Sequence, residues 1–436
     1  MMESESNPIV AMSLQADKNV ISSQSPQTRI LEITIIPPVK TTQKERAPLN
    51  LSLVLDRSGS MSGEKLEYVK QAASHLLDLL EPSDQAAVII YDDAVNTLIP
   101  LHWVTDSFRA DAKEKIRQVR TGGSTFLSGG WLRGCEEIAP GISESSINRT
   151  LLLTDGLANK GIVDLEELAT HAREIYQRGI ATTCFGVGHG YNEHLLEAMS
   201  NAGGGNFHYL ETLNAIPLEF EREFEELISV TLRDTELSLD LPEHVNATVS
   251  AGYDARTTDN RMTIALGSLY SGKEKRIYVT LKFDHALSGE TVCIKATVRG
   301  KGAGGFLCED EKLLTIKVVS DEEEHKAAAD QALLERFAVV DLADQANEAL
   351  KRERAGDRAG ANRILNQSLS AHSANIPASM RSKFKFMADQ MSSGLDESAR
   401  KRYHQEEYFN RRGRDFIRDY PLNLVNGHLI ARIENA

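Results

Sequence analysis

Strand-length apolar runs alternate strictly with amphipathic helical stretches between residues 45 and 232, and this pattern constrains the fold most. The runs are LSLVLD (51–56), AAVIIYDD (86–93), RTLLLTDG (149–156), IATTCFGVG (180–188) and NFHYL (206–210). Near-continuous apolar strands are typical of a parallel sheet with both faces covered by helices. The pattern therefore predicts an α/β fold with a doubly wound, mostly parallel, Rossmann-like sheet. NTLIPLHWV (96–104) is expected at its edge, because Pro100 cannot donate to a strand ladder.

The segments on either side of this unit follow a period of two. Residues 233–320 contain short alternating runs at regular spacing, which predict an antiparallel β-sandwich. Residues 1–44 contain the strand candidates Ile9–Leu14 and Arg29–Ile36. Two strands are too few to stand alone, so we expect them to complete the sandwich. The α/β unit of residues 45–232 would then be an insertion in the sandwich.

Helical spacing returns after Ser320. We expect a small helical module at 321–405 and a C-terminal tail at 406–436 without a clear pattern. The charged run DEEEH (321–325) before the module suggests that it packs loosely on the rest. A basic cluster between Arg400 and Arg418 also contains Glu406, Glu407 and Asp415, and we interpret it as a solvated helix face.

Composition and net charge limit the classes of function that the protein can have. The 436 residues are 41% hydrophobic and 26% charged, with a formal net charge of −14. Nucleic acids and anionic membranes require a basic surface, so neither is expected as a partner. We see no secretory signal and no apolar window long enough for a membrane span. The sequence predicts a cytoplasmic protein.

Oxygen-bearing side chains gather where the predicted strands end. Asp56 and Asp155 close two buried runs, Ser58 and Ser60 follow Asp56, and Thr125 lies in the glycine-rich TGGSTFLSGG (121–130). The carboxyl ends of parallel strands are where open α/β sheets bind ligands. Carboxylates and hydroxyls, with no sulfur or imidazole, suit a hard divalent cation: Mg²⁺, with Mn²⁺ as the alternative.

The same residues carry a family resemblance. DRSGS (56–60), with Thr125 in GGST and Asp155 in LLLTDG, resembles the DxSxS-based metal motif of von Willebrand factor A (VWA) domains. The likeness covers about residues 45–230. It implies a metal-ion-dependent adhesion site in which Ser58, Ser60 and sometimes Thr125 touch the ion, while Asp56 and Asp155 hold it directly or through water. The layout also resembles bacterial proteins labelled calcium-activated chloride channel homologues and inter-alpha-trypsin inhibitor heavy chains. The channel label conflicts with the lack of a predicted membrane span.

The resemblance implies a protein-binding adapter or assembly factor rather than an enzyme. In VWA relatives a partner's Asp or Glu completes the coordination of the ion, and in some bacterial relatives the partner is an AAA+ ATPase of the MoxR type. One alternative is a metal-independent scaffold. Another is a metallohydrolase, although the predicted site offers no histidine or free carboxylate as general base. His189, His194 and His208 could form a second metal cluster, but we interpret them as ordinary surface or satisfied histidines.

Overall fold

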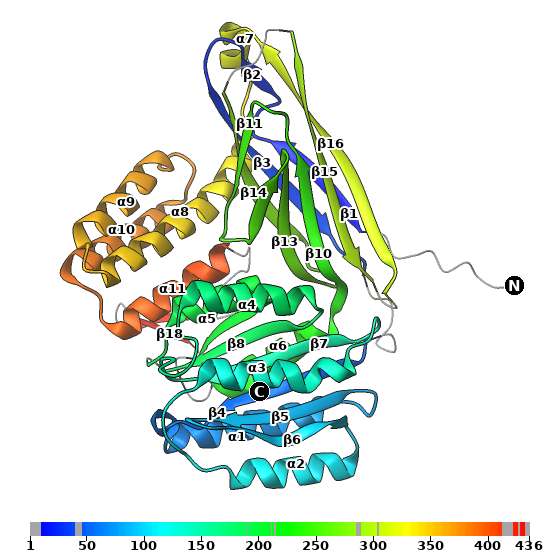
Figure 1. Cartoon of the computed structure of the whole chain (residues 1–436). Coiled ribbons are helices and arrows are strands. Elements are labelled where there is room, and N and C mark those ends of the chain that lie inside the picture. Colours follow the sequence, from blue (N-terminus) through cyan, green and yellow to red (C-terminus); the bar gives the residue numbers. More distant parts are fainter. Residues whose placement is uncertain are drawn as a thin grey trace, which may run out of the picture.

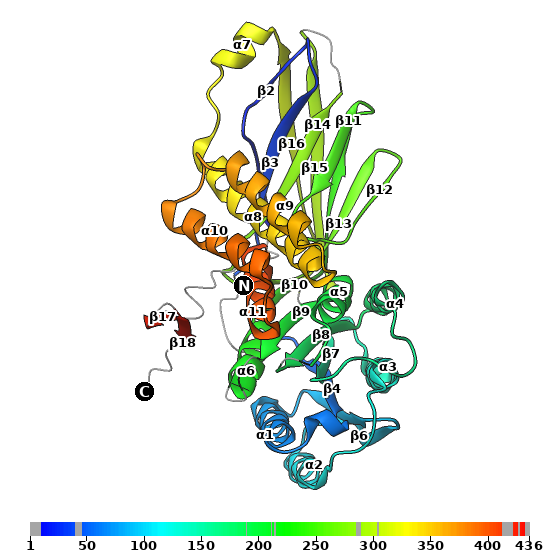
Figure 2. The same cartoon turned by 90° about the vertical axis from the view of Figure 1, so that its left-hand side faces the viewer.

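The computed structural model describes residues 10–39, 46–188, 190–210, 212, 215–284, 289–302, 305–411, 422–425 and 428–431. An α/β domain lies at one end of this part of the chain, and an antiparallel sandwich stands on it (Figure 1). The C-terminal helices lie alongside the junction of the two, as both views show (Figure 2).

A six-stranded sheet forms the centre of the α/β domain, in the order β6-β5-β4-β7-β8-β9. Its strands are β4 (Leu49–Asp56), β5 (Gln85–Tyr91), β6 (Val95–Trp103), β7 (Ile147–Thr154), β8 (Ala181–Val187) and β9 (Gly204–Leu210). All neighbours are parallel except the hairpin partners β5 and β6. The predicted doubly wound, mostly parallel sheet is confirmed, with β6 at its edge.

Helices cover both faces of this sheet. They are α1 (Glu64–Leu79), α2 (Asp106–Gln118), α3 (Leu127–Ile138), α4 (Leu165–Gln177), α5 (Glu193–Ala202) and α6 (Ala215–Ile228). On β4, Leu51, Leu53 and Leu55 share one apolar cluster with α1, α2 and α6. Val54 points the other way, into a cluster with α3, α4 and α5. Both faces of β4 are therefore buried, and Asn50 and Ser52, which alternate with its leucines, bond Asn148 and Thr150 on the neighbouring β7.

The sandwich consists of two sheets around one apolar core. The first contains β1 (Ala11–Ala16), β3 (Gln27–Ile36), β14 (Lys275–Phe283) and β11 (Val245–Val249). The second contains β12 (Ala255–Thr258), β13 (Arg261–Tyr270), β10 (Val230–Asp240), β15 (Thr291–Lys301), β16 (Leu307–Val319) and β2 (Val20–Ser22).

Strands from before and after the α/β domain pair with each other in both sheets. β3 pairs with β14 in antiparallel fashion, and β2 pairs with β16 in parallel. The sandwich therefore closes only when both ends of its sequence meet. The predicted insertion of the α/β domain into the sandwich is confirmed.

Helices follow the sandwich, and their packing corrects one prediction. They are α7 (Asp321–Lys326), α8 (Gln331–Arg354), α9 (Arg358–Ala371), α10 (Ala378–Ser393) and α11 (Glu397–Arg411). Residues near the start of α8, Leu333 and Phe337, belong to the sandwich core, while Leu342 and Leu350 belong to the helices' own core. One helix thus shares its apolar surface between two cores, and the expectation of loose packing was wrong.

The final helix α11 docks on the α/β domain. Tyr408 joins the apolar cluster of Phe207 on β9, whose amide donates to the tyrosine hydroxyl at 3.2 Å. Lys401 and Arg411 are buried, at 1% and 4% exposed. The interpretation of this basic segment as a solvated face was therefore wrong for Lys401 and Arg411, which pair with Glu193 and Glu197 of the α/β domain. Arg412, Arg414 and Arg418 lie outside the described residues. Helix α11 also runs past residue 405, where we had expected the tail to start, and β17 (Leu422–Val425) pairs with β18 (His428–Ala431) in that tail.

Candidate functional site

Asp56 occupies the end of β4, at the centre of the sheet's carboxyl edge, and is 0% exposed. Its Oδ1 accepts a hydrogen bond from the amide of Ser58 at 2.8 Å, and its Oδ2 accepts one from Oγ1 of Thr154 at 2.6 Å. Burial raises the pKa of Asp56 to about 6, although these hydrogen bonds act in the opposite direction. A nearby second carboxylate, Asp155, also raises it.

The serines of the DRSGS loop connect the two carboxylates. The hydroxyls of Ser58 and Ser60 lie 3.1 Å apart, and Ser60 donates to Oδ1 of Asp155 at 2.7 Å. Asp155 follows β7, the neighbour of β4, so two adjacent strands deliver the two carboxylates to one edge.

Thr125 reaches the same edge from the loop before α3. A Cβ placed on Gly156 would lie 3.1 Å from Oγ1 of Thr125 and 3.5 Å from Oγ of Ser60, so both hydroxyls flank this glycine. The Thr125 amide donates to Oδ1 of Asn159 at 2.9 Å, which ties the threonine loop to the loop after β7. The structure thus brings together all the residues predicted for the metal site: Asp56, Ser58, Ser60, Thr125 and Asp155.

Close backbone approach holds the loops in place. The amide of Gly122 donates to the carbonyl of Arg57 at 2.7 Å, and that of Gly59 donates to the carbonyl of Gly123 at 2.8 Å. A Cβ on Gly122 would lie 1.7 Å from Oδ2 of Asp92, which in turn is 3.0 Å from Nη2 of Arg57. A Cβ at position 122 would therefore displace the Asp92 carboxylate.

Sequence reasoning missed three residues that support this site. They are Thr154, which bonds Asp56; Asn159, which bonds the Thr125 amide; and Lys65, whose Nζ lies 2.5 Å from Oδ2 of Asp155. Thr154 stands inside the quoted LLLTDG and could have been nominated as a buried hydroxyl beside an aspartate. No local pattern points to Lys65, because only the fold brings the first turn of α1 to the end of β7.

The outer rim of the site is open to solvent. Gly59, Ser60, Gly122 and Gly123 are exposed, whereas Asp56 and Asp155 lie below them. Leu157 is an apolar residue in the loop directly after Asp155, and it is 57% exposed.

The chemistry of these groups fits a hard cation. The donor set consists of carboxylate and hydroxyl oxygens, the ligands that Mg²⁺ and Mn²⁺ prefer. Two buried carboxylates face a single neighbouring ammonium, that of Lys65, which is 34% exposed. One further cation would offset the remaining negative charge.

The sequence model of the family described as von Willebrand factor type A domain matches residues 50–222, the part of the chain that holds this sheet and this site. A protein of Synechocystis, sll0103, is 30% identical over 366 residues, which cover 81% of this chain and 85% of the relative. The chain belongs to the VWA family. The α/β domain described above is its VWA domain.

Two further comparisons show how far the likeness extends. Inter-alpha-trypsin inhibitor heavy chain H1 of Bos taurus is 25% identical and matches 64% of this chain but only 28% of its own length. A von Willebrand factor type A structure from Catenulispora acidiphila aligns with a TM-score of 0.73 at 16% identity, over 94% of this chain and 98% of the other. At that identity the second likeness concerns the fold alone, and it includes the sandwich and the helices.

Within the described ranges, no helix combines the length and the apolar character that crossing a membrane requires.

The histidines do not form the cluster that we considered from the sequence. His208 is buried between Glu219 and Glu223, at 3.1 and 3.0 Å, and His189 lies outside the described residues. Burial alone would lower the pKa of His208, but the two carboxylates raise it to about 9. His194 instead faces His404 on α11, with ring centres 4.8 Å apart.

Proposed function

We propose that the protein is a metal-dependent protein-binding adapter whose VWA site binds Mg²⁺, or Mn²⁺, and captures an acidic side chain of a partner. The observation that supports this most is the meeting of two carboxylates and three hydroxyls at one edge of the sheet. Ser58, Ser60, Thr125, Asp56 and Asp155 would hold the ion. When bound, the ion would supply a positive charge that attracts a carboxylate more strongly than a neutral oxygen.

The arrangement of the loops favours a ligand that comes from outside. The rim residues Gly59, Ser60, Gly122 and Gly123 leave the upper side of the site uncovered. The exposed Leu157 beside it offers an apolar contact, and protein interfaces combine such contacts with a few polar anchors. A cation at the bottom of the site and an exposed leucine beside its rim therefore suit an Asp or Glu presented on a protein surface.

Two measurements test the proposal. The first is Mn²⁺ binding to the full-length protein, followed by electron paramagnetic resonance. We expect binding to disappear in Asp56→Ala and to persist in Asp111→Ala, a matched change of an exposed carboxylate on α2. The second is affinity capture from the native extract in Mg²⁺ and in chelator, with the same variants.

Separate outcomes identify separate failures. Captured proteins that are lost in chelator and lost with Asp56→Ala support the adapter, and an AAA+ ATPase of the MoxR type is one candidate to look for among them. Capture that is unchanged in chelator and in Asp56→Ala contradicts metal-dependent binding and favours a metal-independent scaffold. Mg²⁺-dependent turnover of a generic phosphoester or peptide favours the metallohydrolase.

The variant Leu157→Ser separates the metal from the partner. It leaves the oxygen donors in place, so Mn²⁺ binding should be unchanged. Capture should weaken by about tenfold if the exposed leucine contacts the partner.

A further inference from the structure

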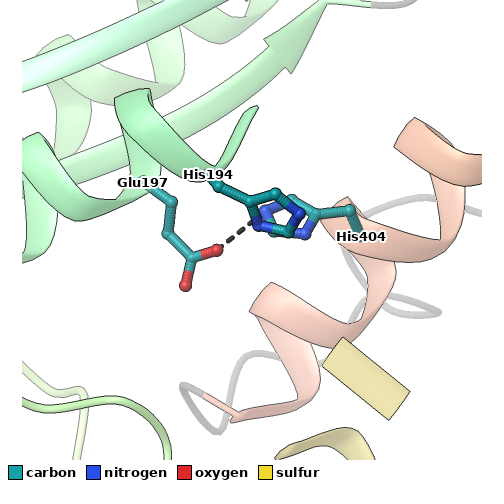
Figure 3. A group of neighbouring side chains, drawn as sticks. All are labelled: His194, Glu197 and His404. Carbon is teal, nitrogen blue, oxygen red and sulfur yellow. Dashed lines mark ion pairs between the residues drawn. The ribbon is translucent and has the colours of Figure 1, made fainter. Parts of the chain in front are cut away.

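A second group of metal-ligating side chains lies between the VWA domain and the C-terminal helices (Figure 3). His194 and Glu197 come from α5, and His404 comes from α11. One ligand atom of each lies within 4.8 Å of the other two. His194 and Glu197 are three positions apart on one helix, a spacing that places both side chains on the same face.

Two nitrogens of this group have no hydrogen-bond partner. They are Nδ1 of His404, a residue that is 1% exposed, and Nε2 of His194. Nε2 of His404 lies 2.7 Å from Oε2 of Glu197, which is its partner. Buried polar nitrogens without partners are unfavourable, and an imidazole nitrogen that carries no proton has a lone pair that a metal could use.

Glu197 supplies a carboxylate charge to this group. Burial alone would raise the pKa of Glu197, but Arg411 and His404 outweigh it and hold that pKa well below its usual range. Nη2 of Arg411 bonds Oε1 of Glu197 at 2.8 Å, which leaves Oε2 facing His404.

We propose that His194, Glu197 and His404 bind a Zn²⁺ ion that links α5 of the VWA domain to α11. Two imidazole nitrogens and one carboxylate oxygen are a ligand set that zinc takes, with a fourth position for water. The nitrogen ligands distinguish this site from the all-oxygen site at the sheet edge. Arg411 would orient the carboxylate, as outer-shell partners of metal ligands do.

The fit requires a small adjustment. Ligand atoms around a tetrahedral zinc are about 3.3 Å apart, as follows from metal–ligand distances of about 2.0–2.1 Å. The largest separation of up to 4.8 Å would therefore shrink by about 1 to 2 Å, whereas Oε2 of Glu197 and Nε2 of His404, now 2.7 Å apart, would move slightly apart. His194 is only partly buried, so its side chain has room to make this movement.

The test uses the full-length Asp56→Ala protein after treatment with chelator, so that the sheet-edge site does not contribute. Zn²⁺ binding is measured by calorimetry, and Co²⁺ is added as a spectroscopic probe. We expect one equivalent of Zn²⁺ and the intense visible absorption of four-coordinate Co²⁺. His404→Gln and His194→Gln should each weaken Zn²⁺ binding by about 100-fold or more, since even outer-shell changes weaken metal sites by about 10–100-fold.

The control is His171→Gln, which removes a partly exposed histidine from α4 and should bind Zn²⁺ as the parent does. If His404→Gln does not fold, as judged by circular dichroism, His194→Gln decides the matter because its side chain is less buried. The proposal is wrong if the Asp56→Ala protein binds no Zn²⁺, or if His194→Gln and the control bind it equally. Neither result bears on the Mg²⁺ site, because every protein in this experiment lacks Asp56.

Discussion

Replacement of Lys401 by Met tests whether the C-terminal helices are part of the main fold. Lys401 is 0% exposed at its side chain, and its Nζ donates to Oε2 of Glu193 at 2.9 Å and to the carbonyl of Tyr191 at 2.6 Å. The ammonium also lies 3.7 Å from the centre of the Tyr191 ring. These partners belong to the VWA domain, and the one further ion-pair contact of Lys401 is with Glu397 of its own helix, at 3.7 Å. The substitution therefore removes mainly contacts between α11 and the VWA domain.

The expected loss of stability in Lys401→Met follows from the burial of Glu193. Removing one partner of a buried ion pair costs about 3–5 kcal/mol of the free energy of unfolding. Nη1 of Arg354 remains 2.7 Å from Oε1 of Glu193, so we expect the lower end, about 3 kcal/mol.

The pKa of the Glu193 carboxyl group supports a loss of stability of the same order. Burial alone would raise its pKa, but Lys401, His404 and Arg354 lower it from 4.5 to about 2. That shift corresponds to about 3 kcal/mol. Burial also lowers the pKa of Lys401, so we expect the ion pair to contribute no more than about 3 kcal/mol to the free energy of unfolding.

The assay is urea unfolding of the full-length protein at neutral and acidic pH, with Lys385→Met as control for an exposed lysine on α10. The folded-state pKa of Glu193 is depressed, so its stabilising effect is present above about pH 4.5 and is lost as the pH falls towards about 2. The wild type should therefore lose more stability on acidification than Lys401→Met does. A Lys401→Met protein within about 1 kcal/mol of the Lys385→Met control, with the same acid response as wild type, would refute the reasoning.

Four further predictions concern other contacts described above. Lys65→Met removes the ammonium beside Asp155 and should tighten Mg²⁺ binding by about tenfold in calorimetry, because like charges no longer compete; unchanged affinity contradicts this. Gly122→Ala, which forces a Cβ against Asp92, should lower the free energy of unfolding by about 1–3 kcal/mol, whereas Gly59→Ala, with its nearest neighbour at 3.6 Å, should change it little in thermal unfolding. The pKa of His208 is raised to about 9, so its stabilising effect is complete below about pH 6.5 and is lost as the pH rises through about 9; urea unfolding of His208→Gln should show a flatter profile there. Deletion of residues 321–436 exposes the sandwich surface under Leu333 and the VWA surface under Tyr408, so gel filtration should show aggregation rather than a folded monomer.

Local patterns in the sequence determined the sheet and the position of its metal motif. Every residue of β4 is buried, whereas β10 of the sandwich alternates between buried and more exposed residues. Because parallel strands end at a common edge, Asp56 and Asp155 could be placed together before their contacts were known. Thr125 follows a helix rather than a strand, and the resemblance to the VWA motif assigned it to the same site. The insertion followed in the same way, since two strands do not form a stable sheet by themselves.

Only the tertiary structure decided which charges are buried. The segment around Arg400 has the composition of a solvated helix face, yet Lys401 and Arg411 pair with Glu193 and Glu197 on a distant helix. The pairing of Lys65 with Asp155 and the meeting of His194 with His404 were equally invisible in the sequence. The physical reason is that apolar periodicity is a local property of the chain. The partner that makes a buried charge or imidazole tolerable is supplied by another element, and its position depends on how the whole chain packs.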